Sequence, residues 1–396
     1  MRPCFRPGYG FALVLASLVA SSPLACSALK TDSGQTDASV DASDPPNDDA
    51  TPPLDGGSLE TSTPDAPAAP TTYDEAQALL QTLRTPGPVT SQGSRVVCTD
   101  SYVAWRDSDG SVHTWSGRTT LRQDYRFKAP RLVGFAPSDM YIPADAPDFS
   151  TLDAYLTENG AKPGSAAYAT YHWATNDGII RLDQFVNGID QNGTRVRFWD
   201  LSQGSTPSDI GGVLATRQPP LAYGLGKIVI PGGTTFPTPL YVVDITTKTT
   251  DTLTFDAAIA IREAAVSELG VLVSYARTGP QSALRLYRKS NGMRSEVGDE
   301  VAVRPGLFPD SPVDEHKLLN RIAAYEGWVL YDSAYGIFGF HLDRGLLVAL
   351  QLGQGKKAFL VDSMCVMNKL GLLAYRLNGD ATGQVFTVPL ARVLPP

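Results

Sequence analysis

Short apolar segments separated by turn residues fill the chain from residue 94 to its end. They are rich in β-branched and aromatic residues and are bounded by Gly, Pro, Asn or Asp, which is the pattern of short β-strands. Many of them follow a recurring segment in which a charged residue precedes small or apolar residues. Clear copies of this repeat marker contain Arg95, Arg131, Arg217, Arg262 and Arg321, and a weaker copy begins at Asp362.

The spacing of the copies predicts the fold. The closest two, at Arg95 and Arg131, start 36 residues apart, and a degenerate copy near Tyr171 divides one of the wider gaps. Periods of about 40–50 residues that each hold several short strands are typical of β-propellers. We therefore predict an all-β protein with a β-propeller over residues 94–396, built from seven blades of four strands, with six or eight blades as alternatives.

A short helix precedes the propeller. Thr72 and Glu75 have the spacing of a capping box, and a proline-rich segment begins at Pro86. We expect residues 73–93 to form this helix and a lead-in, with the helix packed on one rim of the propeller. The apolar positions at helical intervals are Ala76, Leu79, Leu80 and Leu83.

The last repeat contains three recognisable strands, 359–367, 372–377 and 384–388. A blade with three strands leaves an unpaired edge, which favours aggregation unless another strand covers it. We expect residues 89–92 to add the missing strand and to close the ring.

Charge is distributed unevenly along the chain. The formal charge of −8 divides into +3 for residues 1–30, −9 for residues 31–72 and −2 for residues 73–396. The nearly neutral propeller does not favour a nucleic-acid partner. Residues 26–72 are rich in Asp, Pro, Ser and Thr, cannot bury enough apolar surface to fold, and are expected to form an extended tether.

The first residues have the pattern of an export signal. Arg2 and Arg6 precede an apolar core over residues 11–20, which is too short to span a bilayer as a helix. We assign residues 1–25 to the signal peptide.

Leu24-Ala25-Cys26 resembles the lipobox of bacterial lipoproteins, although Pro23 stands where an aliphatic residue is usual. This resemblance implies a lipidated Cys26 and a protein anchored in the cell envelope, at the outer membrane. The alternative is ordinary cleavage near Ala20 or Ala28, which would give a secreted or periplasmic soluble protein.

Two segments resemble strands of known propeller families. The segment that ends in Trp199-Asp200 is similar to the third strand of a WD40 blade. Residues 240–248, Leu-Tyr-Val-Val-Asp-Ile-Thr-Thr-Lys, are similar to bacterial YVTN-type propellers. The Gly-His half of the WD40 signature is missing, so the resemblance implies the propeller architecture and not membership of the WD40 family.

Two cysteines remain after the signal and the lipidation position are set aside. Cys98 and Cys365 both lie three residues after the charged residue of their repeat, in the first and the last unit, which are neighbours in a closed ring. An oxidising compartment favours a disulfide between them. The alternative is two buried free thiols that behave as small apolar residues.

The five marker arginines are the candidate ligand-binding residues. If they surround one mouth of the central channel, they could bind an anionic ligand such as a uronate, a phosphate or a carboxylate. The alternative, which the repetition favours, is that each forms a structural ion pair with an acidic residue of its own or the next blade. Glu263, Asp244 and Asp200 are examples of such partners.

Other chemistry is weakly represented. The histidines do not have metal-ligand spacing, and no nucleophile elbow or phosphate loop is found, so we expect neither a metal nor a cofactor. The five tryptophans, which we expect in the core before any sugar-binding role, are Trp105, Trp115, Trp173, Trp199 and Trp328.

The function predicted from these features is that of a monomeric, non-catalytic envelope lipoprotein that binds a protein or an anionic polysaccharide. A glycoside hydrolase or polysaccharide lyase on the same scaffold is the alternative, because paired carboxylates can be far apart in sequence.

Overall fold

The described residues form seven antiparallel sheets, and we call them blades 1 to 7 in chain order. A computed structural model describes the following residues: 69–90, 94–107, 112–116, 121–125, 141–145, 151–156, 161–167, 171–187, 191–203, 206–216, 218–232, 239–254, 260–276, 282–290, 293–294, 299–300, 307–312, 318–380 and 382–395. Residues 67–396 belong to one compact unit.

The first four blades follow one another along the chain. Blade 1 contains β2 (Val96–Cys98), β3 (Val103–Arg106), β4 (Val112–Trp115) and β5 (Leu121–Tyr125). Blade 2 contains β6 (Tyr141–Asp145), β7 (Thr151–Leu156) and β8 (Gly164–Ala167). Blade 3 contains β9 (Tyr171–Ala174), β10 (Gly178–Asn187), β11 (Gln191–Asp200) and β12 (Ser208–Leu214). Blade 4 contains β13 (Ala222–Gly224), β14 (Lys227–Pro231), β15 (Pro239–Asp244) and β16 (Thr249–Thr254).

The last three blades complete the set. Blade 5 contains β17 (Ala260–Ser267), β18 (Gly270–Ala276), β19 (Ser282–Ser290), β20 (Met293–Arg294) and β21 (Asp299–Glu300). Blade 6 contains β22 (Leu318–Tyr325), β23 (Trp328–Ser333), β24 (Gly336–His341) and β25 (Leu347–Leu352). Blade 7 contains β26 (Val361–Met367), β27 (Leu372–Leu377), β28 (Gln384–Pro389) and β1 (Thr85–Val89). Short helices η1 (Gln354–Lys356), η2 (Asn368–Leu370) and α2 (Leu390–Val393) lie between or after these strands.

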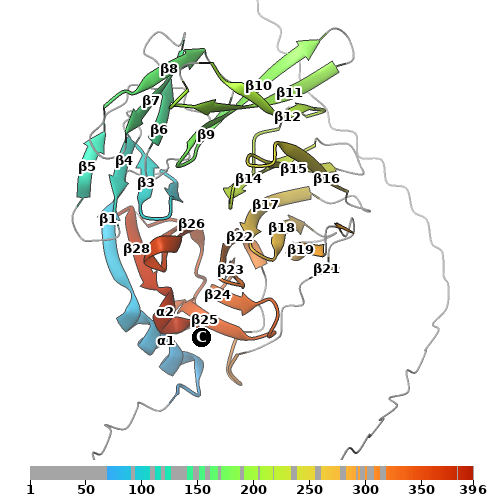
Figure 1. Ribbon diagram of the computed structural model, residues 1–396. Coiled ribbons are helices and arrows are strands. Elements are labelled where there is room, and N and C mark those ends of the chain that lie inside the picture. Colours follow the sequence, from blue (N-terminus) through green and yellow to red (C-terminus); the bar gives the residue numbers. More distant parts are fainter. Residues whose placement is uncertain are drawn as a thin grey trace, which may run out of the picture. The chain divides into compact units, whose positions relative to one another are not determined.

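The blades follow one another around a ring (Figure 1). The inner strands shown by the residues around the centre of the ring are β2, β9, β13, β17, β22 and β26. Of these, β13, β17, β22, β26 and β2 contact one another in that order. The prediction of an all-β propeller is confirmed. Within the described residues five of the blades have the predicted four strands, whereas blade 2 has three and blade 5 has five. The predicted start of blade 2, at Arg131, lies outside the described residues.

The core consists of apolar clusters between neighbouring blades. Between blades 3 and 4, for example, Ile180 and Val196 of one sheet pack with Ile228 and Val243 of the next, and all four are buried. Similar clusters join blades 4 and 5, 5 and 6, 6 and 7, and 7 and 1. Blades 4 to 7 therefore bury both faces against their neighbours, which holds this part of the ring together.

The helix α1 (Tyr73–Leu83) begins with the predicted capping box: the Thr72 hydroxyl accepts from the Glu75 amide, and the Glu75 carboxylate accepts from the Thr72 amide. The helix packs on the outer strand β25 of blade 6. Leu79, one of the apolar positions at helical intervals, is 46 % exposed because the packed stripe runs through Tyr73, Ala76 and Leu80.

Polar contacts fix this helix at both ends. The Tyr73 hydroxyl donates to the carbonyls of Tyr335 (3.1 Å) and Gly353 (3.3 Å). The Gln351 side-chain amide donates to the Leu80 carbonyl at 3.0 Å.

Among the described residues, no helix is both long and apolar enough to cross a bilayer.

The ring is closed by β1, which is the outer strand of blade 7 and pairs with β28. The sequence correctly predicts that an N-terminal strand completes this blade but places it at residues 89–92, about four residues too late. The strand contains Pro86 and Pro88, which an outer edge strand accepts because its outward-facing groups need no partner.

Candidate functional site

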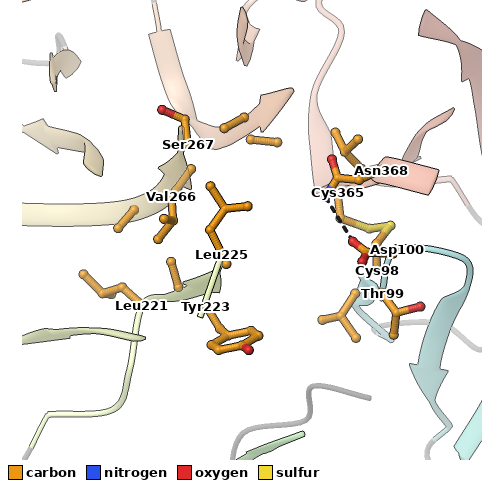
Figure 2. A pocket seen from close by; sticks show the side chains of 18 of the residues that line it. Cys98, Thr99, Asp100, Leu221, Tyr223, Leu225, Val266, Ser267, Cys365 and Asn368 are labelled. Carbon is orange, nitrogen blue, oxygen red and sulfur yellow. Dashed lines mark hydrogen bonds between the residues drawn. A yellow bond between two sulfur atoms is a disulfide. The ribbon is translucent and has the colours of Figure 1, made fainter. Parts of the chain in front are cut away.

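A cavity of about 1040 Å³ lies among the inner strands of six blades. Its lining comes from β2, β9, β13, β17, β22 and β26 and from the turns that follow them. Figure 2 shows Leu221, Tyr223 and Val266 on one side of this space, and Cys98 and Cys365 on the other. We call it the central cavity.

The inner strands run in the same direction along the central cavity. In blades 1 and 7, Val96 lies beside Ser363 and Cys98 beside Cys365, so residue numbers rise together. The cavity therefore has one end where the inner strands begin and another where they end. We call the first end the arginine mouth, and it carries Arg95, Arg262 and Arg321.

We call the second end the acidic mouth. It is formed by residues one to three positions past the ends of the inner strands, which are Asp100, Asp177, Leu225, Glu268, Glu326 and Asn368.

At the arginine mouth, Arg321 forms an ion pair with Glu263 of the preceding blade. The second oxygen of this carboxylate accepts from the amide of Ile322 at 3.2 Å, and Asp332 accepts from the amide of Arg321 at 2.7 Å. The two contacts with Glu263 tie β22 to β17, and the contact with Asp332 is made within blade 6. They favour the structural interpretation for Arg321, with Glu263 as its partner.

Of the other four candidate arginines, the structure describes two. Arg95 is exposed and Arg262 is half-buried. Arg131 and Arg217 lie outside the described residues. Anion binding by the five marker arginines stays a prediction. Asp244, one of the acidic residues suggested as an arginine partner, pairs instead with Lys227 at 3.4 Å.

The predicted disulfide is confirmed. Cys98 and Cys365 are bonded, with their Cα atoms 5.5 Å apart, and they join the inner strands of the first and last blades. Both are partly exposed on the wall of the central cavity. The position of Cys26, the predicted lipidation residue, lies outside the described residues.

The acidic mouth was missed by the sequence analysis. Asp177, Glu268 and Glu326 are exposed, and each belongs to the turn after an inner strand. Asp100 belongs to the corresponding turn of blade 1, where its carboxylate accepts from the Asn368 side chain at 3.3 Å. The acidic residues lie one to three positions after their inner strands, and acidic residues are so common in turns that this spacing carries little information by itself.

Leu225 interrupts this acidic series with an apolar side chain. It is 58 % exposed and has a φ of 48°, in the left-handed region that a leucine rarely adopts. Gly226 follows with a φ of 70°, so the two residues form the tight turn of the β13–β14 hairpin. Asn or Gly would be more favourable than leucine at this position.

Aromatic side chains stand just inside the acidic mouth. Trp173 and Tyr223 come from neighbouring inner strands, and their ring centroids are 6.4 Å apart. Burial and, to a smaller extent, the negative charge of Asp177 raise the pKa of Tyr223 to about 12. The phenol is therefore neutral at physiological pH.

The tryptophans divide as expected between core and surface roles. Trp105, Trp115, Trp199 and Trp328 are buried, whereas Trp173 is half-buried and lines the cavity. Among the residues that the structure describes, no group of three or more His, Cys, Asp or Glu side chains could hold a metal ion.

The described histidines have structural neighbours. His113 pairs with Asp107 at 3.0 Å and stacks on Trp105. His341 lies edge-on to Trp328, and His172 is buried in blade 3.

Comparison with known proteins supports the fold. No protein-family model and no curated protein matches the sequence. Among solved structures, hydrazine synthase from Kuenenia stuttgartiensis matches with a TM-score of 0.50 and 8% identity, covering 76% of this chain and 97% of that one. At this identity the similarity shows the β-propeller fold and nothing about the reaction.

Two further structures have similar coverage. The β-propeller domain of Cps50 (Swd1) from Myceliophteria thermophila matches with a TM-score of 0.49 and 12% identity, over 77% of this chain and 99% of that one. BamB from Moraxella catarrhalis matches with a TM-score of 0.40 and 14% identity, over 76% of this chain and 99% of that one.

Proposed function

We propose that this protein is a non-catalytic recognition protein of the cell envelope, anchored by a lipid on Cys26, whose propeller binds a partner at the central cavity. The observation that carries the proposal is the exposed, left-handed Leu225 at the acidic mouth. Backbone conformations of this kind persist where function favours them, because they lower the stability of the fold. A large apolar side chain held there suits contact with a partner.

The shape of the cavity supports the same function. Six blades contribute to one space of about 1040 Å³, which is in the range of sites that enclose a ligand or a peptide segment. Apolar side chains such as Val266 and Leu221 line part of it, and the rim is polar. This combination of an apolar interior and a polar rim is common in binding interfaces.

The N-terminal sequence supports the location. A lipid on Cys26 would fix the chain to a membrane, and the acidic residues 31–72 would hold the propeller away from its surface. A propeller presented in this way is suited to recognition of an envelope component.

Recovery of a partner from detergent-solubilised envelope tests the proposal. The full chain is compared with its Leu225→Asn variant and with Leu346→Asn, a control that removes another exposed leucine, located between β24 and β25. Asn tolerates the left-handed conformation better than leucine does. We therefore expect Leu225→Asn to raise the free energy of unfolding by about 1 kcal/mol, so the variant should fold at least as stably as the wild type. We expect it to recover at least about fivefold less partner, the loss of one buried apolar side chain from an interface.

The partner must also be located at the cavity. A photo-crosslinking residue at position 268 should give a covalent product with the same partner. Equal recovery by all three proteins, together with no crosslink at this position, would show that the central cavity is not the binding site.

A further inference from the structure

The acidic mouth differs in charge from the rest of the cavity. Four carboxylates from four blades surround it, and the described residues that line this end include no Lys or Arg. The basic lining residues Arg95, Arg262 and Arg321 belong to the opposite end. The cavity is therefore polarised along its length.

These four carboxylates are not neutralised by cations within the described part of the chain. None of Asp100, Asp177, Glu268 and Glu326 takes part in an ion pair there, in contrast to Glu263 at the arginine mouth. Asp100 accepts from the amide of Asn368, which leaves its negative charge in place. Four like charges around one opening create a negative potential that attracts cations and repels anionic lipids and nucleic acids.

The wall beneath the carboxylates supplies a second, independent feature. Leu225 and Val266 offer apolar contacts, and Trp173 and Tyr223 offer aromatic faces. Lys and Arg side chains combine an apolar stem with a charged end, and aromatic faces attract their charge. An apolar and aromatic wall under a negative rim matches this composition.

We infer that the acidic mouth binds a cationic segment of a protein, a loop or terminus in which Lys or Arg residues alternate with apolar ones. The inference rests on the proposed function and specifies the partner class. The four carboxylates face the charged ends of the segment, and Leu225, Val266 and the aromatic pair contact its apolar side chains.

Binding of a synthetic peptide tests the partner class. The probe is a fluorescent octapeptide of alternating lysine and leucine, and the control probe replaces every lysine with glutamate. Fluorescence anisotropy is measured with the full chain at about 50 mM and about 500 mM NaCl, because screening weakens charge attraction. We expect binding of the lysine peptide only, and weaker binding at the higher salt concentration.

Two double variants locate the interaction. Glu268→Gln with Glu326→Gln removes two charges from the acidic mouth, and Asp74→Asn with Asp209→Asn removes two charges from α1 and β12, outside the cavity. We expect the first pair to bind the lysine peptide about fivefold more weakly, from two lost exposed charge pairs, and the second pair to bind like the wild type. Leu225→Asn should also weaken binding at both salt concentrations, because its contribution is apolar.

The outcomes separate the inference from the proposed function. Equal binding of both peptides, or equal weakening by the two double variants, would overturn the cationic partner class. If the double variant at the mouth still recovers the envelope partner and Leu225→Asn does not, the cavity recognises a partner of different charge and the proposed function stands.

Discussion

At the scale of single residues, His172 is a titratable side chain that the fold encloses almost completely. It is 1 % exposed, and neither ring nitrogen has a hydrogen-bond partner among the described residues. Its neighbour across the sheet is Arg181, which is also buried and contacts Asp183 at 3.2 Å. Burial and the charge of Arg181 lower the pKa of His172 to about 3, so the folded protein holds this imidazole neutral.

The unfolding free energy should therefore fall in mild acid. In the unfolded chain His172 gains a proton as the pH drops below about 6.5, whereas in the folded state its pKa of about 3 prevents this. The contribution of the neutral His172 to the free energy of unfolding is fully present above the pKa of the unfolded chain. Its loss should lower the free energy of unfolding by about 2 kcal/mol between pH 7.5 and pH 5. Urea unfolding of wild type and His172→Gln at both pH values measures the difference. The same pH dependence in both proteins would contradict the assignment.

The ion pair between Arg321 and Glu263 gives a second prediction at this scale. If it ties blades 5 and 6, Glu263→Gln should lower the unfolding free energy by about 1 kcal/mol, and Arg321→Met should cost a similar amount. In the double variant the two losses should not add. Additive losses in urea unfolding would show that the two side chains are not coupled and would revive the interpretation of Arg321 as a ligand-binding residue.

At the scale of elements, the edge strand β1 illustrates how the chain protects an exposed sheet edge. Pro86 and Pro88 remove two amide donors, which limits pairing with other chains. The Gln384 side chain then reaches across from β28 and donates to the carbonyls of Gly87 (2.7 Å) and Pro88 (3.3 Å). A side chain thus replaces ladder hydrogen bonds that the irregular register of β1 does not make.

Gln384→Ala should loosen β1 without disturbing the other strands of blade 7. We expect hydrogen exchange at the amides of Thr85, Gly87 and Val89 to become about five- to tenfold faster, equivalent to the loss of about one hydrogen bond. Gln354→Ala, which alters the exposed η1, serves as the control. Unchanged exchange in residues 85–89 would show that the backbone pairing of Thr85 and Pro86 is sufficient by itself.

The sequence predicts elements best where one local pattern decides them. The capping box of α1 and the two third strands that end at Asp200 and Asp244 were predicted correctly, because caps and hairpins depend on nearby residues. The position of β1 was not, because its partner lies about 300 residues away and proline normally ends a strand.

The site was predictable only in part for the same reason. The repeated arginine located the inner strands and brought the two cysteines together, whereas the carboxylates at the acidic mouth became a group only when the ring placed separate turns side by side.

At the scale of the whole molecule, the ring is joined at its ends in two ways. On the outside β1 completes blade 7 by hydrogen bonding, and on the inside Cys98–Cys365 links the first and last blades covalently. The bond encloses a sequence separation of 267 residues. Such a long loop loses much conformational entropy in the unfolded chain when it is cross-linked.

Removal of the disulfide should lower the unfolding free energy by about 2–4 kcal/mol. Urea unfolding of the paired variant Cys98→Ser with Cys365→Ser measures this loss, and the wild type with a reductant should move towards the variant. Thiol titration of the unreduced wild type supplies the control, since neither residue should react. A variant as stable as the oxidised wild type would show that the apolar contacts between blades 7 and 1 close the ring unaided.

The pairing of β1 with β28 also sets an order of events during biosynthesis. The strand β1 is synthesised first but cannot pair until β28, its hydrogen-bonding partner, is completed with residue 389. Until then blade 7 has no outer strand and blade 1 has no neighbour on its open side. A nascent chain that stops early thus leaves the ring open, and its exposed strand edges make it prone to aggregation and dependent on chaperones.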